Sequence, residues 1–212
     1  MSTYVATSPE ALRAAFTALG NALGGEKYAL VGGGACVALG SQRATQDIDI
    51  VVLRGHTPDT RKLLRNSPDF EVEPRTSHTY YRAAEAVEIE ILAPPALFRE
   101  TFDETTEVIA IGNLKVLKPA LLLNAKCGSI VSRASEAKRR TDAQDIIFLL
   151  SYCAGNSAEL PKGPEVPNAS KEFVEAFVQK YGAEESWTRA GYDLQMGLLL
   201  YKDLVCLEAQ WF

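Results

Sequence analysis

The sequence has few of the residues that build metal clusters or disulfides. Its 212 residues include only four cysteines and two histidines, and no two cysteines are spaced as C-x-x-C. The cysteines are scattered through apolar surroundings, at Cys36, Cys127, Cys153 and Cys206. Neither a zinc site nor a disulfide framework is therefore expected, and the cysteine usage is typical of a protein kept in a reducing compartment.

The sequence also lacks long hydrophobic runs and any excess of positive charge. No run approaches the ~18 apolar residues of a membrane-spanning helix, and no basic stretch followed by an apolar core marks a signal peptide. The formal net charge is −5, which gives the chain as a whole no attraction to nucleic acid or anionic membranes, although a local basic patch is compatible with it. We therefore expect a cytoplasmic protein with no membrane partner.

What the sequence does have is a mixture of helix and strand patterns in its first half and helix patterns in its second. Helices are expected at 9–23, 33–39, 58–66, 119–133, 138–153, 170–181 and 185–206, and strands at 28–31, 47–53, 78–83, 86–93 and 106–111. Turn-forming residues predict a loop at about 154–170. The pattern favours an α+β fold, with a mixed β-sheet flanked by helices in residues 1–115 and a helical part in residues 116–212.

Two aspartates interrupt an otherwise apolar strand. Because side chains two residues apart in a strand point to the same face, Asp47 and Asp49 would project side by side. Such carboxylates repel unless they are solvated or share a cation, and Mg²⁺ prefers oxygen ligands of this kind. A later strand repeats the arrangement with Glu88 and Glu90, and periodicity does not choose between them. For an isolated pair of acids, solvated side chains on an edge strand are the commoner interpretation.

Three glycines, Gly32, Gly33 and Gly34, stand between the first predicted strand and the next helix. Such a turn lets backbone N–H groups approach a phosphate at the helix N-terminus. A dinucleotide-binding G-x-G-x-x-G pattern would need glycine where the chain has Val37, and the next acid follows too soon for that pattern. For the glycines alone, a tight turn without a ligand is an equally open interpretation.

Taken together, the glycines and acids resemble the DNA polymerase β-like nucleotidyltransferase superfamily. The resemblance is carried by Gly33-Gly34 before a helix, by Asp47-Ile48-Asp49 on a strand, and by an acid on a nearby strand. The run "RATQDID", with Arg43 and Thr45 ahead of the two aspartates, is similar to the Arg-x-Ser/Thr-x-Asp-x-Asp motif of abortive-infection nucleotidyltransferase toxins. The resemblance implies the superfamily's fold and a nucleotide substrate.

A second motif of that branch lies on the helices further along. It consists of Lys126, Arg133, Asp142 and Asp145, and with it the resemblance spans residues 28–150. The chain departs from the family pattern in two ways. The serine usual after the first glycine is absent, and the third acid is a glutamate instead of an aspartate. The residues that follow Glu90 in the strand fit the family pattern better than those that follow Glu88.

The resemblance implies a nucleotidyl transfer assisted by one or two Mg²⁺ ions. Asp47, Asp49 and Glu90 would hold the metal, and amides of the glycine turn would bind the β- and γ-phosphates of a nucleoside triphosphate. The implied catalytic residues are Asp47, Asp49, Glu90, Lys126 and Asp145. The implied nucleotide-binding residues are Gly32, Gly33, Gly34, Arg43, Thr45, Lys126 and Arg133.

Several of these assignments leave alternatives open. Arg43 would touch phosphate or pair with a carboxylate. Asp145 would orient Lys126 or Arg43, or act as a base for the acceptor. Asp142 has a simpler interpretation as an acid in the first turn of a helix. The basic run at 138–140 is either a solvated helix start or a contact for a nucleic-acid backbone.

The sequence thus predicts a Mg²⁺-dependent nucleotidyltransferase that moves an NMP from an NTP to a hydroxyl group of a tRNA, a protein or a small molecule. The alternatives are a catalytically inactive protein of the same fold, which binds nucleotide or serves as a partner subunit, and a Rossmann-type binding protein. The sequence does not indicate the oligomeric state. The side chains expected to be ordinary surface or core residues are His56, His78, Tyr80 and Tyr81.

Overall fold

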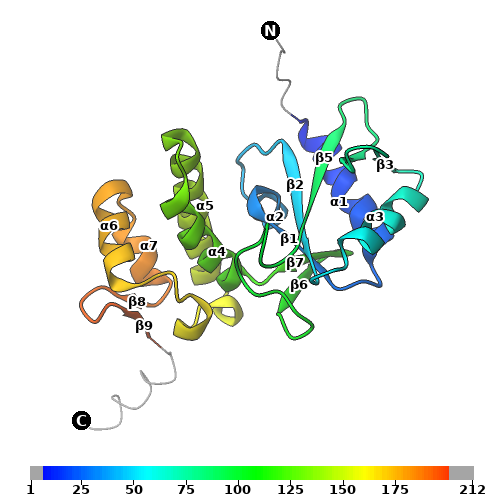
Figure 1. The fold of residues 1–212 in the computed structure, drawn as a ribbon. Helices are drawn as coiled ribbons and strands as arrows, with labels where there is room; N and C mark the ends of the chain where they lie inside the picture. Colours follow the sequence, from blue (N-terminus) through cyan, green and yellow to red (C-terminus); the bar gives the residue numbers. More distant parts are fainter. Residues whose placement is uncertain (1–6, 201–212) are drawn as a thin grey trace. The chain divides into compact units, whose positions relative to one another are not determined.

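The computed structural model describes residues 7–200. The chain divides into two compact units, Met1–Leu117 and Lys118–Phe212. The first unit contains a large β-sheet with helices, and the described part of the second is mostly helical (Figure 1). The expected α+β class, with a mixed sheet flanked by helices, is therefore confirmed. None of the described helices is both long and apolar enough to cross a membrane.

The first unit builds one seven-stranded mixed sheet in the order β3-β4-β5-β2-β1-β7-β6. In chain order its elements are α1 (Pro9–Leu23), β1 (Tyr28–Val31), α2 (Gly32–Ala38), β2 (Asp47–Val52), α3 (Thr57–Asn66), β3 (Phe70–Val72), β4 (Thr79–Tyr81), β5 (Val87–Leu92), β6 (Val108–Ile111) and β7 (Leu114–Leu117). The central strand β2 runs antiparallel to β1 and parallel to β5.

Helix α1 forms where its cap and its apolar spacing predict it. The Ser8 hydroxyl accepts a hydrogen bond from the Ala11 N–H, 3.2 Å away, and Pro9 occupies the first turn, where its missing N–H costs nothing. Leucines, alanines and Phe16 recur every three or four residues and are buried against the sheet. Burial of apolar surface contributes about 25 cal/mol per Å² to the free energy of folding, so these side chains stabilise the packing of α1 on the sheet.

The two faces of β2 are chemically different. Leu30 of β1 is opposite Ile50 in the register, and both side chains are buried on the face where α1 and α2 pack. The alternate residues of β2, Asp47 and Asp49, point to the other face. The sheet therefore carries its two aspartates on the face opposite Leu30 and Ile50.

The described part of the second unit begins with a helical hairpin and ends in a small strand pair. Its described elements are α4 (Pro119–Ser132), α5 (Glu136–Gly155), the 3₁₀ turns η1 (Ser157–Glu159) and η2 (Gly163–Glu165), α6 (Lys171–Tyr181), α7 (Glu184–Arg189), β8 (Tyr192–Asp193) and β9 (Leu198–Leu199). The buried ring of Trp187 packs edge-on against Phe173, Phe177 and Tyr192. This aromatic cluster ties α6, α7 and β8 together.

Two expectations about secondary structure are wrong. The predicted helix at 185–206 ends at Arg189, because Gly191 and Gly197 adopt positive φ values of 92° and 72° and the chain between them forms a hairpin. Residues 201–206 lie outside the described part of the chain. Strands β3 and β7 were not expected from the sequence. Strand β7 lies beside β1 within the sheet, which makes it a central element.

Candidate functional site

Four acids lie on one face of two adjacent strands in the first unit. Strands β2 and β5 are parallel, and their register places Asp47 beside Glu88 and Asp49 beside Glu90. Register partners on neighbouring strands are about 4.8 Å apart and point to the same face. The aspartates and Glu88 are half-buried, whereas Glu90 is exposed. The fold thus brings Asp47, Asp49 and Glu90, expected from the sequence to act together, onto one surface.

The residues that precede β2 support the two aspartates. The buried Thr45 hydroxyl is 3.3 Å from both the backbone oxygen and Oδ1 of Asp47. Nη2 of Arg43 lies so close to the Cα of Gly33 that a Cβ there would be only 1.6 Å away. This arrangement brings Arg43 and Thr45 to the glycine turn, as expected for a shared site.

Glycine is required at positions 32 and 33 because the charged side chains of Asp49 and Arg43 lie against the backbone there. A Cβ on Gly32, whose φ is +63°, would lie 2.1 Å from Oδ2 of Asp49. Gly33 has no room for a side chain beneath Arg43. Gly34 instead faces the core, where an added Cβ would make ordinary contacts with Leu30 and Phe16. The first two glycines are thus explained by the close approach of Asp49 and Arg43 to the backbone, and their role toward phosphate stays a prediction.

The second motif forms a buried ionic cluster within the second unit. Nζ of Lys126 is 2.9 Å from Oδ1 of Asp142 and 2.7 Å from Oδ2 of Asp145. Arg133 Nε donates to Oδ2 of Asp142 at 2.8 Å, and the Ser129 hydroxyl lies 3.2 Å from the same oxygen. Two basic and two acidic side chains therefore balance inside the α4–α5 hairpin. Asp145 thus contacts Lys126, and its role in orienting that side chain stays a prediction.

The ion pairs of the cluster favour the charged forms of Lys126 and Asp142. Burial by itself would lower the pKa of Lys126, but Asp145 and Asp142 outweigh it and the net pKa is raised. Burial likewise opposes ionisation of Asp142, yet Lys126 and Arg133 lower its pKa overall. The simple interpretation of Asp142 as a first-turn acid is wrong, because α5 begins at Glu136, six residues earlier. The basic run at 138–140 lies within the first two turns of that helix, mostly exposed.

The donor set on β2 and β5 suits Mg²⁺. Asp49 and Glu90 present hard oxygen ligands at adjacent register positions, and Mg²⁺ is usually held by one or two carboxylates together with substrate phosphates and water. Across residues 7–200, no group of three or more His, Cys, Asp or Glu side chains is gathered tightly enough to hold a metal by itself. A metal held by Asp49 and Glu90 would therefore need further ligands from a bound phosphate or water, and this role of the two acids stays a prediction.

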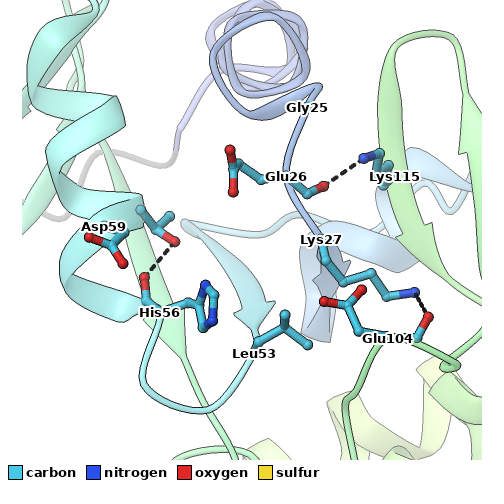
Figure 2. A pocket seen from close by; sticks show the side chains of 9 residues that line it. Gly25, Glu26, Lys27, Leu53, His56, Asp59, Glu104 and Lys115 are labelled. Carbon is cyan, nitrogen blue, oxygen red and sulfur yellow. Dashed lines mark hydrogen bonds between the residues drawn. The ribbon is translucent and has the colours of Figure 1, made fainter.

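Two hollows in the first unit lie away from these acids. One, of about 840 Å³, is lined by α1, the end of α2, the 40–45 loop and the turn between β6 and β7, and it reaches Arg43 and Thr45. The other, of about 380 Å³, lies at the opposite end of β2, beside Leu53 (Figure 2). In Figure 2, Lys27 and Lys115 point their ammonium groups at the backbone oxygens of Glu104 and Glu26. The second hollow contains none of the predicted site residues.

The sequence pattern missed one pair of polar residues beside the acids. Nδ1 of His78 is 3.0 Å from Oε1 of Glu88, so Glu88 has a partner of its own. The Glu90 side chain, by contrast, is exposed and makes no hydrogen bond or ion pair with another residue among residues 7–200. His78 and Glu88 are ten residues apart in sequence, on neighbouring segments of the sheet, so the contact is visible only in the folded structure.

Comparisons with known proteins find a likeness of fold. No protein-family model and no curated protein sequence matches the chain. An antigenic nucleotidyltransferase-like protein from Paracoccidioides brasiliensis matches with a TM-score of 0.63 and 24% identity, over 88% of this chain and 94% of the other. The protein JHP933 from Helicobacter pylori matches with a TM-score of 0.56 and 16% identity, over 95% and 96%.

A third similar structure is a Helicobacter pylori protein provisionally described as a nucleotidyltransferase. Its TM-score is 0.51 and its identity 18%, over 95% of this chain and 99% of the other. All three identities are low, so the likeness shows that the chain has the fold of nucleotidyltransferase-like proteins. The likeness to abortive-infection toxins in particular rests on the sequence motifs alone.

Proposed function

We propose that this protein is a nucleotidyltransferase that transfers an NMP from a nucleoside triphosphate to a hydroxyl group. The observation that carries the proposal is the register of β2 and β5, which sets Asp49 beside Glu90 and Asp47 beside Glu88, two residues earlier on the same face. The fold shared with nucleotidyltransferase-like proteins supports the same reaction class. Fold alone does not decide chemistry, so the acids carry the argument.

In this proposal Asp47, Asp49 and Glu90 hold Mg²⁺. When bound, the metal neutralises charge on the phosphoryl oxygens and helps to align the attacking and leaving groups. The chain's own contribution is to hold the ligands still. Thr45 fixes the Asp47 carboxylate through its hydroxyl, and the absence of a side chain on Gly32 lets the Asp49 carboxylate lie against the backbone.

The remaining expected residues have supporting roles. The amides of the glycine turn and the Arg43 guanidinium are the groups proposed to meet the triphosphate in the first unit. In the second unit, Lys126 is ion-paired with Asp142 and Asp145, and Arg133 is ion-paired with Asp142. We propose these cations as nucleotide contacts, with Asp145 as the residue that orients Lys126.

A turnover assay tests this function. The purified protein is incubated with each of the four α-labelled NTPs and Mg²⁺, and pyrophosphate release and label transfer are measured. Metal-dependent release that stops on addition of EDTA supports the proposal. No release with any NTP, together with no nucleotide-dependent rise in melting temperature, would rule it out.

A second candidate function is a nucleotide-binding or partner protein without catalysis. It is favoured by two departures from the family pattern, the missing serine after the first glycine and a glutamate as the third acid. Such a protein would show a nucleotide-dependent rise in melting temperature but no pyrophosphate release. The two candidates therefore differ in the same pair of measurements.

A further inference from the structure

A histidine lies beside the acids, on the same face of the sheet. Nδ1 of His78 is 3.0 Å from Oε1 of Glu88 and 3.3 Å from the hydroxyl of Tyr80. The imidazole and the phenol ring are stacked, with centroids 6.2 Å apart and an interplanar angle of 21°. Tyr80 is opposite Glu88 in the register, and Glu88 is beside Asp47. Aromatic and acidic side chains thus continue in a row across β4, β5 and β2.

The contact with Glu88 determines which ring nitrogen carries the proton. A carboxylate can only accept a hydrogen bond, so Nδ1 of His78 donates to Glu88, and the Tyr80 oxygen is a second acceptor for the same hydrogen. In the neutral ring, Nε2 then keeps its lone pair. The His78 side chain is 52% exposed, so a bound molecule can reach Nε2. A carboxylate that holds a histidine in this tautomer prepares it to accept a proton from a hydroxyl.

The position of His78 in the sheet brings it near the proposed metal ligands. Thr79 is opposite Ile89 in the register, so the preceding residue, His78, lies at the end of β4 nearest Glu90. Glu90 is in turn the partner of Asp49. Two strand spacings, about 9–10 Å, separate β4 from β2, and Glu90 of β5 lies between the two strands on this face.

The titratable groups near the His78 imidazole are consistent with a hydrogen bond from its Nδ1 to Glu88. Burial, then the charges of Glu88 and Glu73, raise the pKa of Tyr80, so its hydroxyl stays protonated. The Glu73 carboxylate accepts a hydrogen bond from the Thr76 hydroxyl. The titratable groups that face His78 are therefore Tyr80 from β4, Glu88 and Glu90 from β5, and Glu73 from the end of β3.

We propose that His78 is the base that takes the proton of the attacking hydroxyl, with Glu88 as its positioning residue. The inference rests on the proposed nucleotidyl transfer. In that step the hydroxyl oxygen forms a bond to the α-phosphorus of the NTP and its proton passes to Nε2 of His78. The bond from the α-phosphorus to the bridging oxygen breaks, and pyrophosphate leaves. The sequence suggested Asp145 as a base, but Asp145 is fully buried and ion-paired with Lys126.

The tautomer of His78 can be measured without metal or nucleotide. The chain has only two histidines, so two-bond ¹H–¹⁵N correlations of the ring nitrogens are assigned by comparison with His56→Gln. We expect neutral His78 to be protonated at Nδ1 in the unaltered protein and in Glu88→Gln, whose amide oxygen still accepts, and to lose this preference in Glu88→Ala. A proton on Nε2 in the unaltered protein would overturn the inference.

Turnover tests the role in catalysis, with water as the hydroxyl probe and pyrophosphate release from α-labelled NTP as the readout. His78→Gln should lower kcat by about 10²-fold or more with little change in KM for the NTP, whereas the control His56→Gln should match the unaltered protein. Added imidazole should restore part of the rate in His78→Gly, which a purely structural role would not produce. If His78→Gln keeps full kcat while Asp49→Asn is inactive, this inference fails and the proposed function stands. If the unaltered protein shows no turnover, both fail.

Discussion

Asp49 of β2 and Glu90 of β5 are register partners on adjacent parallel strands. They come from segments about forty residues apart, and only the sheet brings them together. The neighbouring pair in the same register is Asp47 and Glu88, but Glu88 is held by His78, 3.0 Å away. The two glutamates that the sequence pattern could not distinguish therefore have different surroundings, and Glu90 is the one left available for a ligand.

Glutamine substitutions should separate the two glutamates. Glu90→Gln removes a proposed metal ligand, so we expect the Mg²⁺ concentration for half-maximal turnover to rise by about tenfold or more. Glu88→Gln keeps a hydrogen-bond acceptor for His78 and should leave the Mg²⁺ requirement unchanged. A Mg²⁺ titration of pyrophosphate release measures both. The reverse result, with only Glu88→Gln raising the requirement, would assign the metal to Glu88.

Gly32 should resist substitution for a local reason. Alanine there would be strained at φ +63°, and its Cβ would displace the Asp49 carboxylate, which lies 2.1 Å from that position. We expect Gly32→Ala to lower the free energy of unfolding by about 1–3 kcal/mol. Gly25→Ala is the matched control, because a Cβ there meets no atom within 4 Å. Urea denaturation compares them, and equal stabilities would contradict the close approach of Asp49.

Removing Lys126 should destabilise the second unit. Lys126→Met leaves the Asp142 and Asp145 carboxylates buried without their shared cation, a situation that costs about 3–5 kcal/mol. Lys138→Met, at an exposed position of α5, should change stability little. Urea unfolding followed by tryptophan fluorescence, to which Trp187, buried in the second unit, contributes, reports the difference. If Lys126→Met were as stable as the control, the ion pairs of Lys126 would make no net contribution to the free energy of unfolding.

The same cluster predicts a pH dependence of stability. The pKa of Asp142 is lowered from 3.8 in the folded protein, so its contribution is present above that value and is lost as the pH falls through the folded pKa. The pKa of Lys126 is raised from 10.5, so its contribution is complete below that value and is lost as the pH rises through the folded pKa. The stability difference between the unaltered protein and Asp142→Asn should therefore be largest between these limits. Urea unfolding in a pH series measures this difference. A stability difference that grows as the pH falls would contradict a stabilising role of the charged Asp142 carboxylate.

Local patterns predicted the elements that local forces determine. Helix α1 follows from the Ser8 cap, the proline after it and a regular apolar spacing. Strand β2 follows from an apolar run whose alternate positions are acidic, and its two faces are as expected. The pairing of β2 with β5 needed the tertiary fold, since no local rule sets which strands become neighbours.

The errors also have physical reasons. Strand β7 follows a two-residue hairpin turn of Gly112 and Asn113, a dipeptide that signals hairpins and could have revealed it. The predicted helix at 185–206 included Gly191 as a helical residue, but the left-handed conformation of Gly191 ends the helical region. The contact of His78 with Glu88 depends on strand register, which short strands with few apolar residues specify weakly in sequence. Functional side chains outside a motif are therefore the hardest part of this site to predict.

The account depends most on Asp47 and Asp49 as ligands of a metal that serves nucleotidyl transfer. The most direct measurement is Mg²⁺-dependent pyrophosphate release from α-labelled NTPs by the Asp47→Asn/Asp49→Asn double variant, beside Asp69→Asn as an exposed acidic control and with folding verified by thermal melting. The account predicts that release falls to background in the double variant and is unchanged in the control. Release by a folded double variant at the rate of the unaltered protein would contradict it.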